Sequence, residues 1–302
     1  MMKKNKKLNA ENVIFTTLNA AFLILLCIAM LYPMLNTLAI SFNESNDTVK
    51  GGIYLWPRIF SLNNYRVVFK MDTIYGAFNM SVLRVIVNVV TNLFFTSMLA
   101  YSISRKEYIF RKPITLIFVL TMYFNAGLIP NYLLIRDLGM INTFSVYWIP
   151  SIISAFNLIV IRTYIKTIPE SFIESAKIDG AHEFTIFGKV IIPLVVPTMA
   201  SIALFVAVGS WNSWFDTFLY NSGKQDLSTL QYELQKLLST ASNAGNRNSG
   251  GADASAAGGS RTVTPQAIRA TITIVASVPI LVVYPFLQKY FVTGLAIGGV
   301  KE

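Results

Sequence analysis

The chain has 302 residues, of which 54% are hydrophobic and only 13% are Asp, Glu, Lys or Arg. Soluble domains carry about 25% charged residues, so this composition excludes an ordinary soluble protein and indicates an integral membrane protein. In a soluble protein the net charge of +10 would indicate nucleic-acid binding. In a membrane protein it reflects the Lys and Arg residues of cytoplasmic loops. We therefore expect contact with membrane lipid and none with nucleic acid.

Six apolar segments are long enough to cross a bilayer, since a crossing helix needs about 20 apolar residues. In chain order they are residues 13–39, 75–102, 114–134, 147–165, 190–219 and 267–291. The third contains Gly127 and Pro130, which predict a break near its outer end. The expected fold is all-α: a polytopic membrane protein with six transmembrane helices, forming a single domain over residues 1–302.

Basic residues predict the orientation of these spans. Four lysines lie in the tail of residues 1–12, and the loop after the second span contains Arg105, Lys106, Arg111 and Lys112. Because cytoplasmic loops carry an excess of Lys and Arg, we expect both termini in the cytoplasm. Residues 168–193 and the tail 293–302 are then cytoplasmic, and the loop 221–264 is extracytoplasmic.

The loop 221–264 contains a stretch of Ser, Gly, Ala and Asn at residues 239–262. With almost no large apolar side chain, this stretch cannot bury enough surface to offset the entropy lost on ordering. We expect it to be flexible. Residues 227–238 just before it have apolar residues at helical spacing and predict a short amphipathic helix.

Residues 168–193 are the most informative segment. Pro169 suits the first turn of a helix, and Gly180 can adopt the left-handed conformation that ends one. We expect a short helix, a glycine turn and a second helix. The first helix carries acids, including Glu174 and Asp179, beside an apolar side. Such a helix suits docking into the groove of a partner. The alternative is an interfacial helix on the membrane, which these acids disfavour because anionic lipids repel them.

This segment carries a family resemblance. Glu174-Ser175-Ala176-Lys177-Ile178-Asp179-Gly180-Ala181, followed by Ile192-Pro193 and Pro197, resembles the EAA loop of ABC importer permeases, with Ser175 where that pattern normally has Ala. The resemblance covers nearly the whole chain. It is strongest to the smaller permease of maltose-type carbohydrate importers, in the branch of lipoprotein-like and complex-polysaccharide permeases. Residues 123–134 and 294–301 also resemble that branch.

The resemblance implies a permease subunit in the bacterial cytoplasmic membrane, forming half of the path for an oligosaccharide, neutral or acidic. Its implied partners are a second homologous permease, two ATPase subunits that bind ATP and Mg²⁺, and an extracytoplasmic sugar-binding protein. A polyamine, phosphate or peptide permease remains the alternative, because the EAA loop does not specify the solute. The chain has no Walker lysine motif, so we expect ATP hydrolysis only in the partner.

A membrane-embedded enzyme is the least supported class. The chain has one cysteine, Cys27, and one histidine, His182, which cannot provide a disulfide or a metal site. We therefore expect no catalytic residue, no metal and no cofactor bound by this chain.

The resemblance assigns ATPase docking to the first helix and its turn: Phe172, Glu174, Ser175, Ala176, Asp179, Gly180 and Ala181. It assigns contact with the ATPase interface to the C-terminal tail, through Gly294, Gly298, Gly299 and Lys301.

Polar residues inside the spans are candidates for the sugar path, because burying them in a bilayer is costly. Amides, carboxylates and aromatic rings are groups that bind sugars, and the candidates are Arg84, Asn88, Asn92, Asn125, Asn157, Trp211, Asn212, Trp214 and Asp216. The alternatives are that the asparagines join helices, that the tryptophans are interfacial anchors, and that Arg84 pairs with Asp216 rather than with an acidic sugar.

Overall fold

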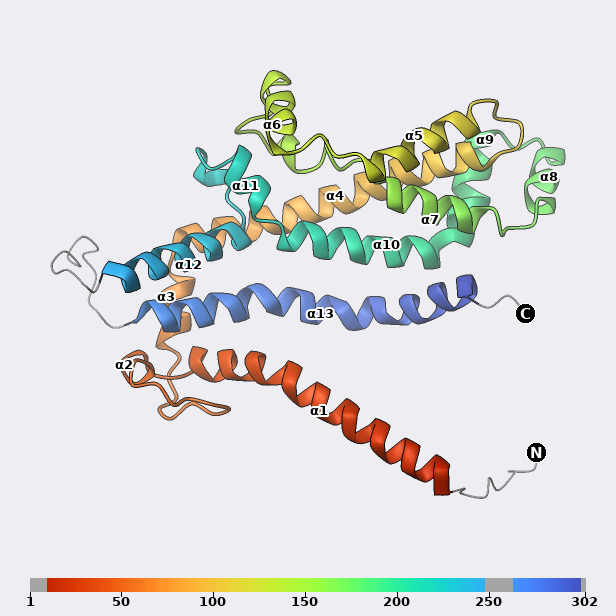
Figure 1. The fold of residues 1–302 in the computed structure, drawn as a ribbon. Coiled ribbons are helices and arrows are strands. Elements are labelled where there is room, and N and C mark those ends of the chain that lie inside the picture. The colour runs from red at the N-terminus through yellow and green to blue at the C-terminus, as the bar shows by residue number, and fades with distance from the viewer. Residues whose placement is uncertain (1–9, 248–262, 300–302) are drawn as a thin grey trace. The chain divides into compact units, whose positions relative to one another are not determined.

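The computed structural model describes residues 10–247 and 263–299. The regular structure of these residues is helical, apart from an isolated bridge between Asn43 and Phe60, as Figure 1 shows. The expected all-α class is therefore confirmed for the described part of the chain. The chain divides into two compact units, one built from Met1–Lys70 and Leu237–Val275, the other from Met71–Lys236 and Ala276–Glu302.

In its described part, the first unit contains three helices of its own, α1 (Ala10–Ser41), α2 (Ser45–Thr48) and α3 (Asn63–Phe69). The helices of the second unit are α4 (Asp72–Ser104), α5 (Arg111–Tyr123), α6 (Leu128–Asp137), η1 (Phe144–Tyr147), α7 (Ala155–Ile165), α8 (Ser171–Ile178), α9 (Glu183–Ile186), η2 (Phe187–Ile191), α10 (Ile192–Asn212), α11 (Phe215–Tyr220) and η3 (Gln225–Leu227). Two further helices are divided between the units, α12 (Leu230–Arg247) and α13 (Pro265–Gly299).

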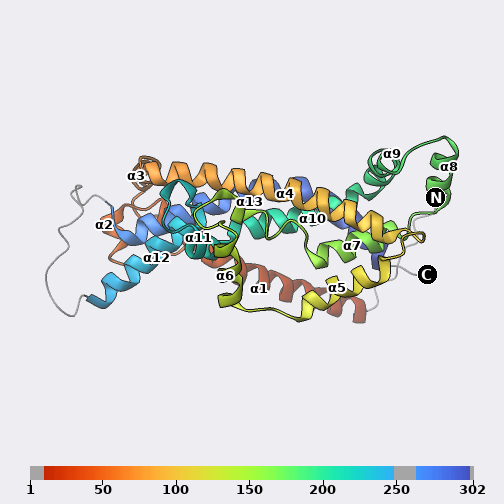
Figure 2. The same ribbon diagram turned by 90° about the horizontal axis from the view of Figure 1, so that it is seen from above.

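In the second unit, α4 is the helix against which α10, α7 and α5 pack. Figures 1 and 2 show α5 and α7 beside the C-terminal half of α4, with α8 and α9 beyond that end. The buried core there contains Ile103 of α4, Leu158 and Ile161 of α7, and Ile202 of α10. Burying these apolar side chains joins the three helices.

Within the described residues, four helices are long and apolar enough to cross a membrane: Val13–Ser41, Asp72–Ser104, Glu183–Asn212 and Pro265–Val283. They correspond to four of the six expected spans. The third expected span is broken into α5 and α6, and Gly127 between them has a φ of 87°. This break agrees with the expectation drawn from Gly127 and Pro130, because a positive φ is readily adopted only by glycine.

Residues 147–165 do not form one continuous helix, contrary to expectation. Tyr147 ends the short helix η1, and α7 starts only at Ala155. Pro150 disfavours helical geometry in the residue before it, and the Ser154 side chain accepts a hydrogen bond from the backbone N–H of Asn157, as an N-cap does. These two local signals outweigh the apolar composition of the segment.

Two further boundaries differ from the sequence prediction. The expected span 190–219 ends as a helix at Asn212 and resumes as α11 at Phe215. The helix expected over 227–238 is α12, which runs to Arg247 and so includes the start of the stretch 239–262. Alanines in that stretch favour helix, and extending a formed helix costs less than starting one. Residues 248–262 lie outside the described residues.

Hydrogen bonds of Asn43 organise the irregular segment between α1 and α3. Asn43 is fully buried; its Nδ2 donates to Asp47 Oδ2 and to Thr48 Oγ1, both at 3.1 Å, and its Oδ1 accepts from the Ile59 N–H at 3.0 Å. Arg58 Nε donates to the same Asp47 oxygen at 2.9 Å. The Asn43 bond and the Arg58 guanidinium lower the pKa of Asp47. Asp47 therefore remains an ionised acceptor at neutral pH.

We expect Asn43→Ala to loosen this segment, because several buried polar groups then lose their partner. The free energy of local opening should fall by about 1–3 kcal/mol, measured as faster amide hydrogen exchange across residues 42–62. Asn46→Ala is the matched control, since Asn46 is exposed and bonds only Glu44 Oε1 among the described residues. Equal exchange in the two variants would contradict the structural role of Asn43.

Candidate functional site

A polar cavity of about 920 Å³ lies in the second unit. It is lined by α4, α6, α7, α10 and α11 and by the irregular segment before α7. Its lining includes amide and hydroxyl groups as well as apolar side chains. Among the described residues that line it, Arg84 and Asp216 are the charged ones.

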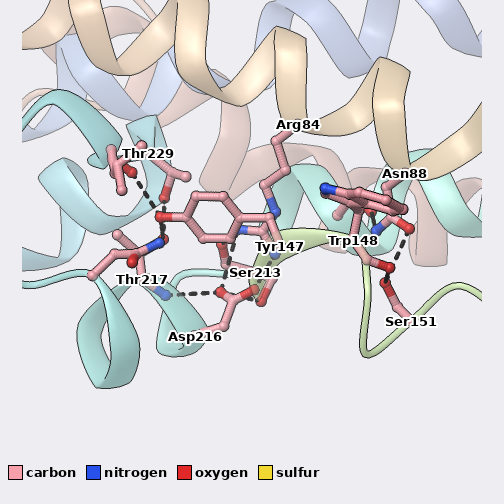
Figure 3. A network of polar contacts seen from close by, with 12 residues as sticks. Arg84, Asn88, Tyr147, Trp148, Ser151, Ser213, Asp216, Thr217 and Thr229 are labelled. Atoms are coloured by element: carbon pink, nitrogen blue, oxygen red, sulfur yellow. Dashed lines mark hydrogen bonds and ion pairs between the residues drawn. The ribbon is translucent and has the colours of Figure 1, made fainter. Parts of the chain in front are cut away.

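Arg84 and Asp216 form an ion pair inside this unit (Figure 3). Arg84 is 3% exposed, and its Nη1 donates to Asp216 Oδ1 at 3.2 Å and to the Ser213 carbonyl at 3.1 Å. Asp216 also accepts from Ser213 Oγ at 2.8 Å and from the Thr217 N–H at 3.0 Å. The charge of Arg84 is therefore balanced within the protein. Its Nε is buried without a hydrogen-bond partner among the described residues.

Tyr147 belongs to this cluster and was not named by the sequence analysis. The guanidinium carbon of Arg84 lies 4.5 Å from the centre of the Tyr147 ring, a cation–π contact. The Tyr147 hydroxyl donates to the Leu227 carbonyl at 2.6 Å. Figure 3 shows the ring between Arg84 and the threonines of α11 and the segment before α12. The sequence held no signal for this contact, because it joins residues 63 positions apart and Tyr147 stands at the start of an apolar run.

Asn88 and Asn92 continue the same face of α4 and are both buried. Asn88 Nδ2 donates to Ser210 Oγ at 2.7 Å, and its Oδ1 accepts from Ser151 Oγ at 3.0 Å. Asn92 Nδ2 donates to the Ser151 carbonyl at 2.6 Å, and its Oδ1 accepts from Asn157 Nδ2 at 3.1 Å. These asparagines both line the cavity and join α4 to its neighbours. The helix-joining role weighed from the sequence is therefore observed, and the sugar-path role stays a prediction.

The structure brings five of the nine candidate path residues together around this cavity: Arg84, Asn88, Asn92, Asn157 and Asp216. The other four lie elsewhere in the unit. Asn125 is exposed and accepts from the Gly127 N–H. Trp211 is buried, donates its indole N–H to the Ala276 carbonyl at 2.9 Å and packs edge-on against Phe78.

Trp214 and Asn212 also lie outside the lining of the cavity. Trp214 packs against Phe215 and Phe218, and Asn212 is exposed and accepts from Gln231. Successive helical residues are rotated by about 100°. Ser210 therefore faces the cavity whereas Trp211 and Asn212 do not. The cavity has further lining residues that the sequence analysis did not name, among them Asn131, Ser151, Ser154 and Ser210.

The segment predicted to dock a partner contains the short helices α8 and α9, joined through Gly180. Gly180 has a φ of 77°. Its N–H donates to the Lys177 carbonyl, and the Ala181 N–H donates to the Ala176 carbonyl. This pair of bonds is a Schellman motif, which ends a helix with a left-handed residue. No atom lies within 4 Å of a Cβ built on Gly180, so the glycine is required by its backbone conformation and not by lack of space.

Core packing fixes α8 to the bundle. Ile173 of α8 and Ile186 of α9 belong to the same buried cluster as Ile103 of α4 and Leu158 of α7. Lys106 Nζ also pairs with Glu170 Oε2 at 2.6 Å. This bond lowers the pKa of Glu170 and raises that of Lys106, so both partners stay charged across the neutral range.

The opposite side of α8 is exposed and apolar. Phe172 is 51% exposed and Ile178 is 87% exposed, and Phe184 of α9 is 77% exposed. Phe172 was among the predicted docking residues, whereas Ile178 and Phe184 were not. Of the other predicted docking residues, Ala176 and Ala181 are partly buried, and the exposed ones are Glu174, Ser175, Asp179 and Gly180. The exposed face of the segment predicted to dock is therefore more apolar than the sequence analysis suggested.

In the predicted C-terminal tail site, the backbone of Gly294, Gly298 and Gly299 belongs to α13. Lys301 lies outside the described residues.

The family model of binding-protein-dependent transport system inner membrane components matches residues 73–215. The polygalacturonan/rhamnogalacturonan transport system permease protein YtcP of Bacillus subtilis (strain 168) is 34% identical over 293 residues, covering 96% of this chain and 99% of YtcP. The arabinooligosaccharides transport system permease protein AraQ of Halalkalibacterium halodurans is 29% identical and covers 94% of this chain and 95% of its own.

A chain in the crystal structure of a bacterial ABC transporter involved in the import of the acidic polysaccharide alginate matches with a TM-score of 0.84. It is 27% identical, and the match covers 95% of this chain and 100% of that chain. Likeness over nearly the full length of both chains extends the relationship beyond the segment matched by the family model. The chain therefore belongs to the family of binding-protein-dependent transport system inner membrane components.

Proposed function

We propose that this chain is one of two permease subunits of an ABC importer for an oligosaccharide that contains uronic acid residues. The observation that carries the sugar class is the likeness to YtcP, named for polygalacturonan and rhamnogalacturonan, over 96% of this chain. The neighbour from the importer of alginate, also an acidic polysaccharide, supports the acidic class. The proposed partners are a second permease, two ATPase subunits that bind ATP and Mg²⁺, and an extracytoplasmic binding protein.

The proposed topology has six crossings with both termini in the cytoplasm. Four crossings use the long apolar helices. The other two use broken elements, α5 with α6 and the segment from η1 to α7. Breaks at these places are compatible with a bilayer because irregular backbone is tolerated where it lines a polar cavity. Residues of both broken elements line the 920 Å³ cavity, among them Asn131 and Ser151.

The cavity is the proposed half of the sugar path. Hydroxyl and amide groups of Asn88, Asn131 and Ser154 suit sugar hydroxyls. Arg84 is the cation that would meet a uronate, and a bound carboxylate would compete with Asp216 for it. That exchange keeps the charge of Arg84 paired in both states. Asp216, which is 25% exposed, would keep the hydrogen bonds from Ser213 Oγ and the Thr217 N–H.

The exposed face of α8 is the proposed contact with the ATPase. Apolar side chains at Phe172 and Ile178, flanked by Glu174 and Asp179, suit a groove with an apolar floor and basic edges. Ile173 and Ile186 join this segment to the core of α4, α7 and α10. A push on α8 would therefore move the helices around the cavity as a rigid body. The tail Gly294, Gly298, Gly299 and Lys301 is a second proposed contact with the ATPase.

We expect Gly180→Pro to abolish uptake while the protein stays in the membrane, because proline cannot adopt the positive φ of the turn. Gly180→Asn is the matched control and should retain most activity, because asparagine tolerates this conformation. Uptake by whole cells and the amount of ATPase that co-purifies with the tagged chain are the measurements. Normal uptake by Gly180→Pro, with the ATPase retained, would refute the docking role.

We expect the effects of substituting Arg84 and Asp216 on the stability of the transporter to be strongly non-additive. Arg84→Ala leaves a carboxylate that is only 25% exposed without its cation, at a cost of about 3 kcal/mol. The double variant with Asp216→Asn should lose much less than the sum of the single variants. Thermal unfolding of the purified transporter measures the four forms. The exposed pair Lys106–Glu170 is the control and should show far weaker coupling. Additive losses at Arg84 and Asp216 would contradict the ion pair.

The substrate class is tested with two trisaccharides of equal length, labelled trigalacturonate and neutral galactotriose. Deleting the gene for this chain should abolish uptake of trigalacturonate, and restoring the gene should rescue it. Excess galactotriose should compete weakly. Uptake of galactotriose alone would indicate a neutral sugar, and uptake of neither would favour the alternative of a solute that is not a sugar.

A further inference from the structure

A second cavity, of about 610 Å³, lies at the C-terminal end of α4 and has no part in the proposed sugar path. Basic side chains from three segments line it: Arg105, Lys106, Arg111, Lys112, Arg162 and Lys166. Glu170 is the acid among the described residues of its lining. Its volume falls within the range of about 300–1,000 Å³ that is usual for ligand pockets.

Acids balance only part of this positive charge. Lys106 pairs with Glu170 at 2.6 Å, and Arg105 pairs with Glu107 at 3.1 Å. Among the residues that the structure describes, no carboxylate lies within 4.0 Å of a side-chain nitrogen in the remaining four, which are Arg111, Lys112, Arg162 and Lys166. An excess of unpaired cations around a cavity favours an anion.

The unpaired cations are close enough to repel each other. Partial burial, together with the charges of Arg162 and Arg111, lowers the pKa of Lys166. Arg162 cannot swing away freely, because its Nε donates to the Ile103 carbonyl at 3.2 Å. An anion placed between these groups would relieve their repulsion and would accept their unused hydrogen-bond donors.

Apolar surface adjoins the cavity and distinguishes a lipid from a free anion. The side chains of Ile165, Ile168 and Ile173 form part of its lining. Helix α5 starts at the cavity with Arg111, and its exposed side includes Leu116 and Ile117, which are 58% and 59% exposed. A molecule with an anionic head and long apolar chains matches a basic cavity that adjoins an apolar helix face. Free phosphate matches only the basic cavity.

We propose that this basic cavity binds the phosphodiester headgroup of an anionic phospholipid, whose acyl chains lie along the exposed face of α5. Basic pockets between membrane helices are sites of this chemical kind. The bound headgroup would neutralise Arg111, Lys112 and Lys166. It would also lie next to the Lys106–Glu170 contact at the base of α8. The site is separate from both the sugar path and the exposed face of α8.

The test is lipid binding to the full transporter, purified in detergent and observed by native mass spectrometry. Dioleoylphosphatidylglycerol should be retained in preference to zwitterionic dioleoylphosphatidylcholine. Replacing Arg111, Lys112 and Lys166 together by Gln should weaken this retention, by roughly fivefold for each charge removed. Lys189→Gln is the matched control, because Lys189 is an exposed lysine in η2 outside the cavity lining and should leave retention unchanged.

Two further measurements distinguish a bound lipid from a free anion, and a loss of lipid binding from a loss of folding. Inorganic phosphate at millimolar concentration should not displace phosphatidylglycerol; displacement would reassign the cavity to a free anion and overturn the lipid proposal. Lys112→Gln alone changes one exposed side chain, and its retention of phosphatidylglycerol is measured if the triple variant does not fold. Equal retention of the two lipids, or unchanged retention in the variants, would overturn the proposal. Because the readout is lipid binding, this result does not depend on the sugar or on transport.

Discussion

The constraint on which this structure depends is that a polar side chain inside a membrane must find its partner within the protein. Helix α4 has Arg84, Asn88 and Asn92 on one face, and lipid could satisfy none of them. Each is met by a group from another element: Asp216 after α10, Ser210 on α10, and Ser151 and Asn157 around the start of α7. This row of polar contacts fixes which helices surround α4 and leaves a polar cavity where they meet.

Apolar packing links this polar region to the segment that contains α8 and α9. The cluster that contains Ile103 of α4 and Leu158 of α7 also contains Ile173 of α8 and Ile186 of α9. Polar contacts near the cavity and apolar contacts farther along therefore join the same three helices, α4, α7 and α10. In the proposed importer, this combination would carry a movement imposed at α8 to the cavity without loss in flexible connections. Close-packed interiors transmit such movements since their side chains have little room to yield.

The sequence predicted what depends on local pattern and missed what depends on distant contacts. Helical class, the break at Gly127 and the left-handed Gly180 follow from hydropathy and from glycine conformation, which are properties of short segments. Spacing along α4 placed Arg84, Asn88 and Asn92 on one face, and the structure shows them around one cavity. Tyr147 and Ile178 were missed, because the contact of the first and the exposure of the second follow from tertiary packing. Pro150 is a sequence signal for the break before α7, but the segment was assigned as one span because of its apolar composition.

The exposure of Phe172 and Ile178 affects how the subunits of the transporter would be produced and assembled. In the proposed complex the ATPase covers these two side chains, which are 51% and 87% exposed in the chain by itself. An unassembled subunit would therefore expose apolar surface that the proposed complex buries. Synthesis of this chain in excess of its partner would favour aggregation or removal by cellular proteases, so the supply of the two proteins has to be matched.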